Sequence, residues 1–108
     1  MNTKRETPMS DRTLAFLEGI IKRKLTISNL LLAIREGEEM TQKDFAKLLG
    51  VSAQYLCDVE HGRKIVTAKS AAIFAKKLGR PPLIFVRLAL QDEIRKAGLK
   101  FEVDLKAA

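Results

Sequence analysis

The sequence predicts a small, mainly α-helical domain that ends in one β-strand, and three observations carry this prediction. Apolar residues recur at intervals of three and four along most of the chain, which is the spacing of one buried helix face. Ser or Thr precedes several of these stretches and Gly follows them, as is typical of helix caps. After Gly98 the apolar residues alternate with charged ones, which is the pattern of a strand. A chain of 108 residues has room for one core.

The amino-terminal part of the chain divides into an arm and a helix. Residues 1–10 have little to bury, so we expect a flexible arm there. From residue 11 to Ile21 the apolar side chains of Leu14 and Leu17 recur at helical spacing. The predicted division is an arm at 1–10, a helical domain at 11–97 and a terminal strand and tail at 98–108.

Three further helices follow in close succession. Thr26 or Ser28 begins the first, which Gly37 ends, and the next two run from residue 41 to 50 and from 52 to 62. Only a Gly-Val-Ser turn separates the last two helices. A turn of that length makes the helices cross steeply, which is the geometry of a helix-turn-helix unit.

The remaining elements are two helices and the strand. Thr67 begins a helix that Gly79 closes, and a Pro-Pro pair begins the last helix, at about 83–97. That helix has more apolar surface than one small core needs. The alternation at 99–105 predicts a strand, and because no second strand is evident, we expect it to pair with its copy in another subunit or with a different protein. The residues expected at a dimer interface are Phe85, Leu88, Leu99, Phe101 and Val103.

Charge and composition narrow the possible partners. The net charge is +7, and residues 61–91 contain seven Lys or Arg and no acidic residue. This balance favours a polyanionic partner, although a solvated lysine-rich surface is the alternative interpretation. We expect a cytoplasmic protein without a membrane partner, since we find no signal peptide and no membrane-spanning stretch. With one cysteine, Cys57, and one histidine, His61, we expect no disulfide, no metal, no cofactor and no enzymatic activity.

The stretch from Met40 to Lys64 resembles the Cro/C1-type, or XRE, helix-turn-helix family. Thr-Gln opens the first helix, Phe-Ala lies inside it, Gly-Val-Ser forms the turn, and Glu-x-Gly-Arg closes the second helix. The resemblance extends over about residues 27–78. It implies a five- to six-helix, lambda-repressor-like fold that binds double-stranded DNA, encoded by a bacterium or phage and associated with the nucleoid when bound.

The resemblance also implies which side chains meet DNA. The helix at 52–61 is expected to enter the major groove with Gln54, Tyr55 and Asp58 facing base edges. Ala53 belongs to the same group but departs from the polar residue common at that position. For Tyr55 the alternative is a partly buried packing residue.

Two more groups of residues follow from the resemblance. Arg35 and Glu60 look like the family's internal ion pair, whose role is structural. The expected phosphate contacts, which position the protein without reading sequence, are Gln42, Lys43, Ser52, Arg63 and Lys64.

We therefore expect a dimeric, sequence-specific transcriptional regulator, more readily a repressor than an activator, that reads a palindromic operator. The alternative is an antitoxin of a type II pair, which binds a toxin protein and represses its own operon; small size and an unpaired strand suit it. The operator, the target genes and any effector ligand do not follow from the sequence.

Overall fold

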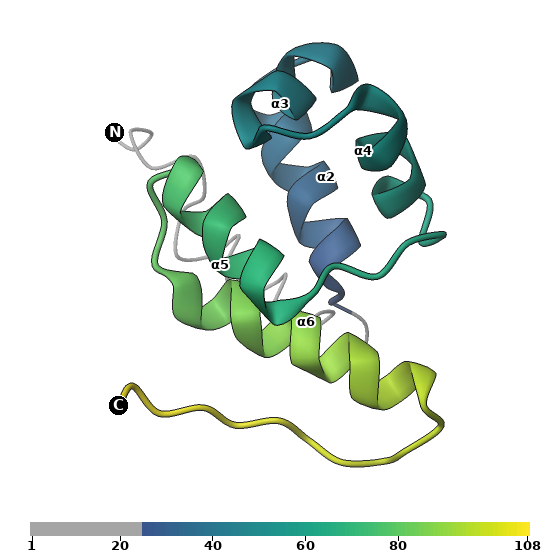
Figure 1. The fold of residues 1–108 in the computed structure, drawn as a ribbon, viewed down its shortest axis with the longest axis vertical. Helices are drawn as coiled ribbons and strands as arrows, with labels where there is room; N and C mark the ends of the chain where they lie inside the picture. Colours follow the sequence, from purple (N-terminus) through teal and green to yellow (C-terminus); the bar gives the residue numbers. More distant parts are fainter. Residues whose placement is uncertain (1–24) are drawn as a thin grey trace, which may run out of the picture.

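The structure, a computed structural model, describes residues 25–108, and the regular secondary structure in this part of the chain is all helical (Figure 1). The predicted arm at 1–10 and the predicted helix at 11–21 lie outside the described residues. The five helices are α2 (Ile27–Gly37), α3 (Gln42–Leu49), α4 (Ala53–Glu60), α5 (Ala68–Lys77) and α6 (Pro82–Lys96).

Four of these helices begin with a side-chain cap of the predicted kind. The hydroxyl of each cap accepts the backbone N–H three residues further on, which satisfies one amide that the helix leaves unpaired. The caps are Thr26, Thr41, Ser52 and Thr67. Helix α6 has no side-chain cap and instead begins at Pro82, where the missing N–H costs nothing. Local sequence therefore sets where each helix starts.

One apolar core holds the five helices together. The side chains of Phe45, Leu56 and Phe85, from α3, α4 and α6, are almost completely buried in it. Helix α5 packs most extensively against α6, while α2, α3 and α4 gather on the other side of the molecule (Figure 1). Phe85 and Leu88, expected at a dimer interface, are core residues of the single chain, 1% and 3% exposed.

The predicted carboxyl-terminal strand is wrong: no strand is present in the part of the chain that the structure describes. The chain reverses at Gly98, which has a left-handed φ of 77°, and the following tail runs back along α6 (Figure 1). A strand needs a second backbone to pair with, and a side chain takes that place here. The Gln91 amide nitrogen donates to the Phe101 carbonyl at 2.8 Å, and its oxygen accepts from the Val103 N–H at 2.8 Å. Alternation predicted the extended backbone but not its partner.

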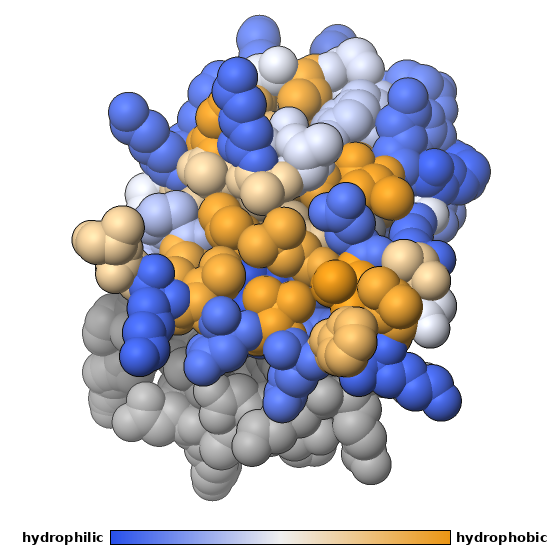
Figure 2. All heavy atoms as spheres, turned by 60° about the horizontal axis from the view of Figure 1, so that its bottom comes forward, coloured by the Kyte–Doolittle hydropathy of each residue, from blue (hydrophilic) through white to orange (hydrophobic). Residues whose placement is uncertain are grey.

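The tail contributes to an apolar face of the molecule. Figure 2, which turns the side of α6 and the tail forward, shows hydrophobic side chains gathered there among hydrophilic ones. Leu99 and Phe101 of the tail are 47% and 65% exposed, and Leu83 at the start of α6 is also exposed.

No helix of the described residues is long and apolar enough to cross a membrane.

Candidate nucleic-acid interface

The turn between α3 and α4 fixes how α4 is presented. Gly50 has a left-handed φ of 78°, which ends α3, and the Val51 N–H donates to the Ala46 carbonyl at 2.9 Å. The Ser52 hydroxyl then accepts the Tyr55 N–H at 2.9 Å and begins α4. Because both bonds are local, the steep crossing of α3 and α4 is set by Gly-Val-Ser itself.

Helix α4 is amphipathic, with one buried and one exposed side. Leu56 and Val59 are buried in the core, which holds that side of the helix against the body. Ala53 and Gln54 are exposed at its first turn, and Asp58 lies partly exposed one turn later. Three of the four expected base contacts therefore lie together at the surface.

Tyr55, the fourth, is placed differently. Its side chain is half-buried, and its ring packs edge-on against Phe74 of α5, with the ring centroids 6.5 Å apart. Burial raises the pKa of the Tyr55 hydroxyl, so the phenol stays protonated near neutral pH. This is the packing position that the sequence analysis gave as the alternative.

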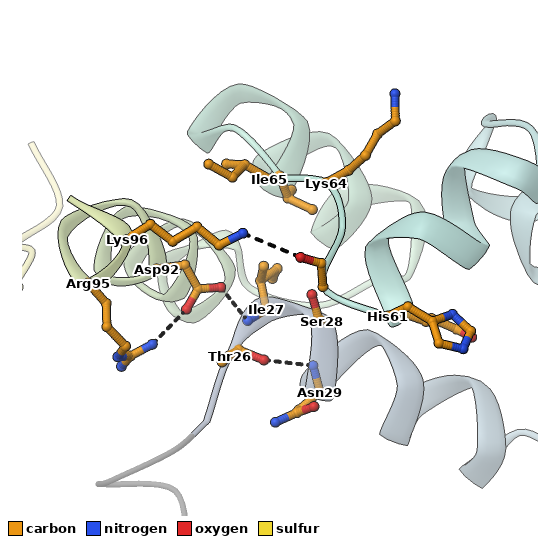
Figure 3. A pocket seen from close by; sticks show the side chains of 13 residues that line it. Thr26, Ile27, Ser28, Asn29, His61, Lys64, Ile65, Asp92, Arg95 and Lys96 are labelled. Carbon is orange, nitrogen blue, oxygen red and sulfur yellow. Dashed lines mark hydrogen bonds and ion pairs between the residues drawn. The ribbon is translucent and has the colours of Figure 1, made fainter. Parts of the chain in front are cut away.

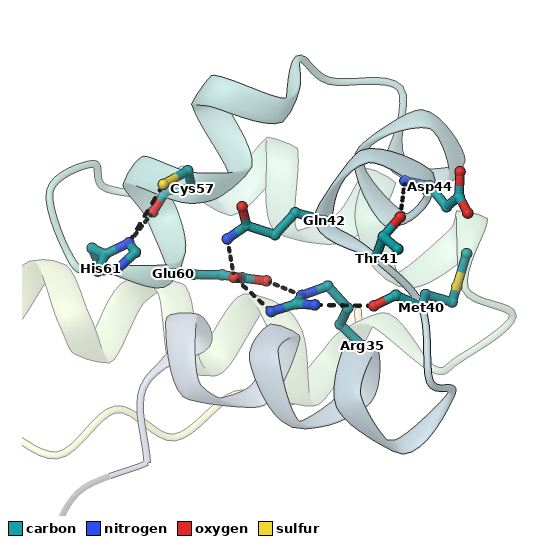
Figure 4. A network of polar contacts seen from close by, with 8 residues as sticks. All are labelled: Arg35, Met40, Thr41, Gln42, Asp44, Cys57, Glu60 and His61. Atoms are coloured by element: carbon teal, nitrogen blue, oxygen red, sulfur yellow. Dashed lines mark hydrogen bonds and ion pairs between the residues drawn. The ribbon is translucent and has the colours of Figure 1, made fainter.

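Glu60 at the end of α4 is the centre of a polar network that joins three helices (Figure 4). Arg35 of α2 forms the expected ion pair with it, donating from Nε to Glu60 Oε2 at 2.7 Å and from Nη2 to Oε1 at 3.2 Å. The remaining Nη1 donates to the Met40 carbonyl at 2.9 Å. The Glu60 side chain is 4% exposed, and its hydrogen bonds hold the pKa of Arg35 above the ordinary value. The network locks α4 to the body at its carboxyl-terminal end.

Gln42, expected at a phosphate, belongs to this same network. Its amide nitrogen donates to Glu60 Oε1 at 2.7 Å (Figure 4). The side chain therefore holds the first residue of α3 against the end of α4. The adjacent Thr41 hydroxyl caps α3 by accepting the Asp44 N–H at 3.1 Å.

The other expected phosphate contacts are exposed residues of α3, of the start of α4 and of the loop that follows it. Lys43 is exposed on α3, and Lys64 is exposed in the loop after α4. Ser52 is exposed at the start of α4 while it serves as the cap. Arg63 is exposed too, but its guanidinium pairs with Asp58 at 3.0 Å. Of these cationic groups, Arg63 is the one that the contacts place beside Gln54, because both side chains bond to Asp58.

His61 and Cys57 interact within one turn of α4. The His61 Nδ1 donates to the Cys57 carbonyl at 2.8 Å and lies 3.6 Å from the Cys57 sulfur (Figure 4). The same carbonyl also accepts the His61 backbone N–H at 3.0 Å, so His61 binds the end of α4 through both its backbone and its ring. His61 is therefore a cap of α4.

A cavity of about 340 Å³ lies between the start of α2, the loop after α4 and the end of α6 (Figure 3). The polar groups in it pair with one another: Asp92 accepts from the Ile27 N–H at 3.1 Å, and Lys96 reaches the Gly62 carbonyl at 3.4 Å. Lys64 extends away from the cavity (Figure 3). These pairings connect α6 to the other helices.

Two contacts were missed from sequence. Asp58 and Arg63 are five residues apart, a spacing at which side chains on one continuous helix do not meet. Gly62, with a left-handed φ of 74°, turns the chain back and brings them together. The sequence did carry a signal for this contact: Asp58 stands just before the Glu-x-Gly turn that ends α4, and Arg63 stands directly after it. The contact of Gln91 with the tail had no such signal.

Comparison with known proteins agrees with this geometry. The helix-turn-helix family model HTH_3 matches residues 31–85, about half of the chain, and spans α3, the turn and α4. Comparison with curated proteins found no match, and comparison with solved structures found none either. The chain belongs to the Cro/C1-type, or XRE, helix-turn-helix family and is a DNA-binding regulator of that type.

Proposed function

We propose that this protein is a sequence-specific transcriptional repressor that binds a palindromic operator as a homodimer, with α4 in the major groove of each half-site. One observation carries the proposal: α4 buries Leu56 and Val59 while Gln54 and Asp58 lie on its exposed side, and exposed cations lie on α3 and in the loop after α4. Amide and carboxylate groups are those that read base edges, and cations position the backbone.

One such helix contacts only a few base pairs, so we propose that two copies related by a twofold axis together read a longer, palindromic site. Two copies reading the same face of a duplex place their half-sites about one helical turn, or ~34 Å, apart. The exposed apolar side chains of Leu99 and Phe101 are the surface we propose for the second copy. A regulator of this kind represses by occupying a promoter.

The experiment is selection of random duplexes by the purified full chain across a salt series, with sequencing of the retained pool. An enriched inverted repeat that disappears in the Gln54→Ala variant supports the proposal. Retention without sequence enrichment, weakening steeply with salt, contradicts it, because phosphate attraction alone behaves in that way. Glu93→Gln, at an exposed residue of α6 outside the proposed DNA and dimer surfaces, is the surface control.

The second candidate function is an antitoxin. The observation that favours it is the exposed apolar tail, since a 65% exposed Phe is a feature of surfaces that bind other proteins. The test is to co-express this chain with the proteins encoded by neighbouring genes, to purify it, and to measure whether one of them co-purifies at a fixed stoichiometry. A stable complex with one small protein supports this function, and purification of the chain alone contradicts it.

A further inference from the structure

Asp58 is the centre of a hydrogen-bonded cluster on the exposed side of α4, formed by Gln54, Asp58 and Arg63. Gln54 Nε2 donates to Asp58 Oδ1 at 3.1 Å. Arg63 donates from Nε to the same oxygen at 3.1 Å, and its Nη2 forms the ion pair with that oxygen at 3.0 Å while donating to the Cys57 sulfur at 3.7 Å. The Arg63 backbone N–H also donates to the Asp58 carbonyl at 2.7 Å.

The convergence on one oxygen leaves the carboxylate asymmetric. Oδ1 receives two hydrogen bonds and the ion pair with Arg63, whereas Oδ2 has no hydrogen-bond partner among residues 25–108. A carboxylate can accept at both oxygens, so Oδ2 keeps its full capacity as an acceptor. The bonds from Gln54 and Arg63 also restrict the side chain to one orientation.

The Arg63 guanidinium reduces the electrostatic repulsion between the Asp58 carboxylate and the phosphates of DNA. An unpaired carboxylate is repelled by phosphates, but Arg63 neutralises Asp58 at close range. The hydrogen bond from Arg63 keeps the pKa of Asp58 below its ordinary value, and the hydrogen bond to Asp58 keeps that of Arg63 above its own. Both groups are therefore charged at neutral pH, and the pair approaches the duplex without net charge.

We propose, building on the function above, that Asp58 selects one cytosine in each half-site and that Arg63 is a positioning residue that acts through Asp58. In the major groove only the amino groups of cytosine and adenine donate hydrogen bonds. The adenine amino group lies beside the N7 acceptor, which repels a carboxylate, whereas cytosine presents only a donor. Oδ2 therefore accepts from cytosine N4 and rejects the acceptor edges of guanine and thymine.

This assignment gives Arg63 a role different from the phosphate contact expected from the sequence. A phosphate contact affects all duplexes alike and contributes about one unit to the slope of log affinity against log salt. A positioning residue changes preference at the base pair that Asp58 reads, and its effect disappears when Asp58 is neutral.

The test is selection of random duplexes, followed by binding titrations, with the full chain and four variants. Asp58→Asn removes the carboxylate at constant shape, and Glu93→Gln, an exposed residue of α6, makes the same charge change as a control. Arg63→Gln is made in the wild type and in the Asp58→Asn background. Circular dichroism establishes that each variant is folded.

Four results support the proposal. Asp58→Asn reduces the preference for cytosine at one position of the half-site about tenfold or more, while the other positions keep theirs. Glu93→Gln leaves every preference unchanged. Arg63→Gln weakens the same cytosine preference in the wild type but has less than a twofold effect in Asp58→Asn.

Two results overturn it while the proposed function stands: an unchanged motif in Asp58→Asn, or an Arg63→Gln effect that is uniform over sequences and persists in Asp58→Asn. Absence of any enriched motif with the wild type overturns the proposed function, and this inference with it.

Discussion

The carboxylate of Asp92, on α6, accepts the backbone N–H of Ile27 at the start of α2, 65 residues away, at 3.1 Å. Arg95 holds the other oxygen at 2.9 Å. This contact joins the last helix to the first described helix, and it does so beside the core. The Ile27 N–H is one of the first amides of α2, which have no acceptor within the helix, and Asp92 takes the place of water as its acceptor.

The Asp92 contact predicts an unusual pH dependence. Burial is the largest influence on the pKa of Asp92 and raises it, although the Ile27 N–H and Arg95 oppose the shift. A raised pKa in the folded state means that the stability contribution is fully present below the ordinary pKa and is lost as pH rises through the folded one. Urea unfolding of wild type and Asp92→Asn at several acidic pH values measures this. The advantage of the wild type over the variant should fall as pH rises and then level off; a growing advantage contradicts the prediction.

Glu60 should be among the most costly polar residues to remove. It is 4% exposed and receives hydrogen bonds from Arg35 and Gln42, so Glu60→Ala leaves a guanidinium and an amide without their partner. We expect the free energy of unfolding to fall by about 3 kcal/mol, as for a broken buried ion pair. Denaturant titration measures it, and Glu93→Ala on α6 should change it by no more than about 0.5 kcal/mol. Equal losses in the two variants rule out a structural role for the network.

Substitution by alanine should have opposite effects on the stability of the protein at two glycines. Gly50 has a φ of 78°, which strains an L-residue, so Gly50→Ala should cost about 1 kcal/mol or more. Gly37, the last residue of α2, has open space where a Cβ would lie, and Gly37→Ala should stabilise the protein by up to about 1 kcal/mol. Thermal unfolding reports both changes. A stabilising Gly50→Ala contradicts the left-handed turn.

Gln91 should hold the tail against α6. Gln91→Ala removes both the donor to Phe101 and the acceptor from Val103. The Val103 amide should then exchange its hydrogen at least several-fold faster, because that N–H loses its partner. Gln91→Glu keeps the acceptor and is the control, in which exchange at Val103 should stay closer to the wild type. Unchanged exchange in Gln91→Ala means that other contacts hold the tail.

The tail should also matter for association. If Phe101 packs against a second copy, Phe101→Asp places a charge in that interface and should raise the dimer dissociation constant about tenfold or more. Sedimentation across a concentration series measures this constant. Ala107→Asp introduces the same charge near the end of the tail and should leave it unchanged. A wild type that is monomeric throughout contradicts the proposed dimer.

Much of the fold was predictable because its determinants are local. Thr41, Ser52 and Gly50 act within a few residues of themselves, so the sequence alone indicated where α3 ends and α4 begins. The pair of Arg35 and Glu60 was expected only from family resemblance, since periodicity does not show that two residues 25 positions apart on different helices meet.

What could not be predicted depends on side chains that reach across the fold. The tail alternates like a strand, but whether it pairs with a backbone or with the Gln91 amide is decided by the position of α6. Gln42 was expected at a phosphate from its position in the motif, whereas its hydrogen bond to Glu60 depends on how α3 packs against the end of α4, which no local pattern indicates. Local pattern fixes the backbone, and only the folded structure shows which polar groups are already paired.

The edge-on contact of Tyr55 with Phe74 has an optical consequence. The chain has one tyrosine and no tryptophan, so its intrinsic emission comes from α4 itself. The phenol lies half-buried in the helix that we propose to enter the major groove. The unmodified protein thus carries its own fluorophore in α4, and if α4 binds DNA as proposed, occupancy can be followed without a label.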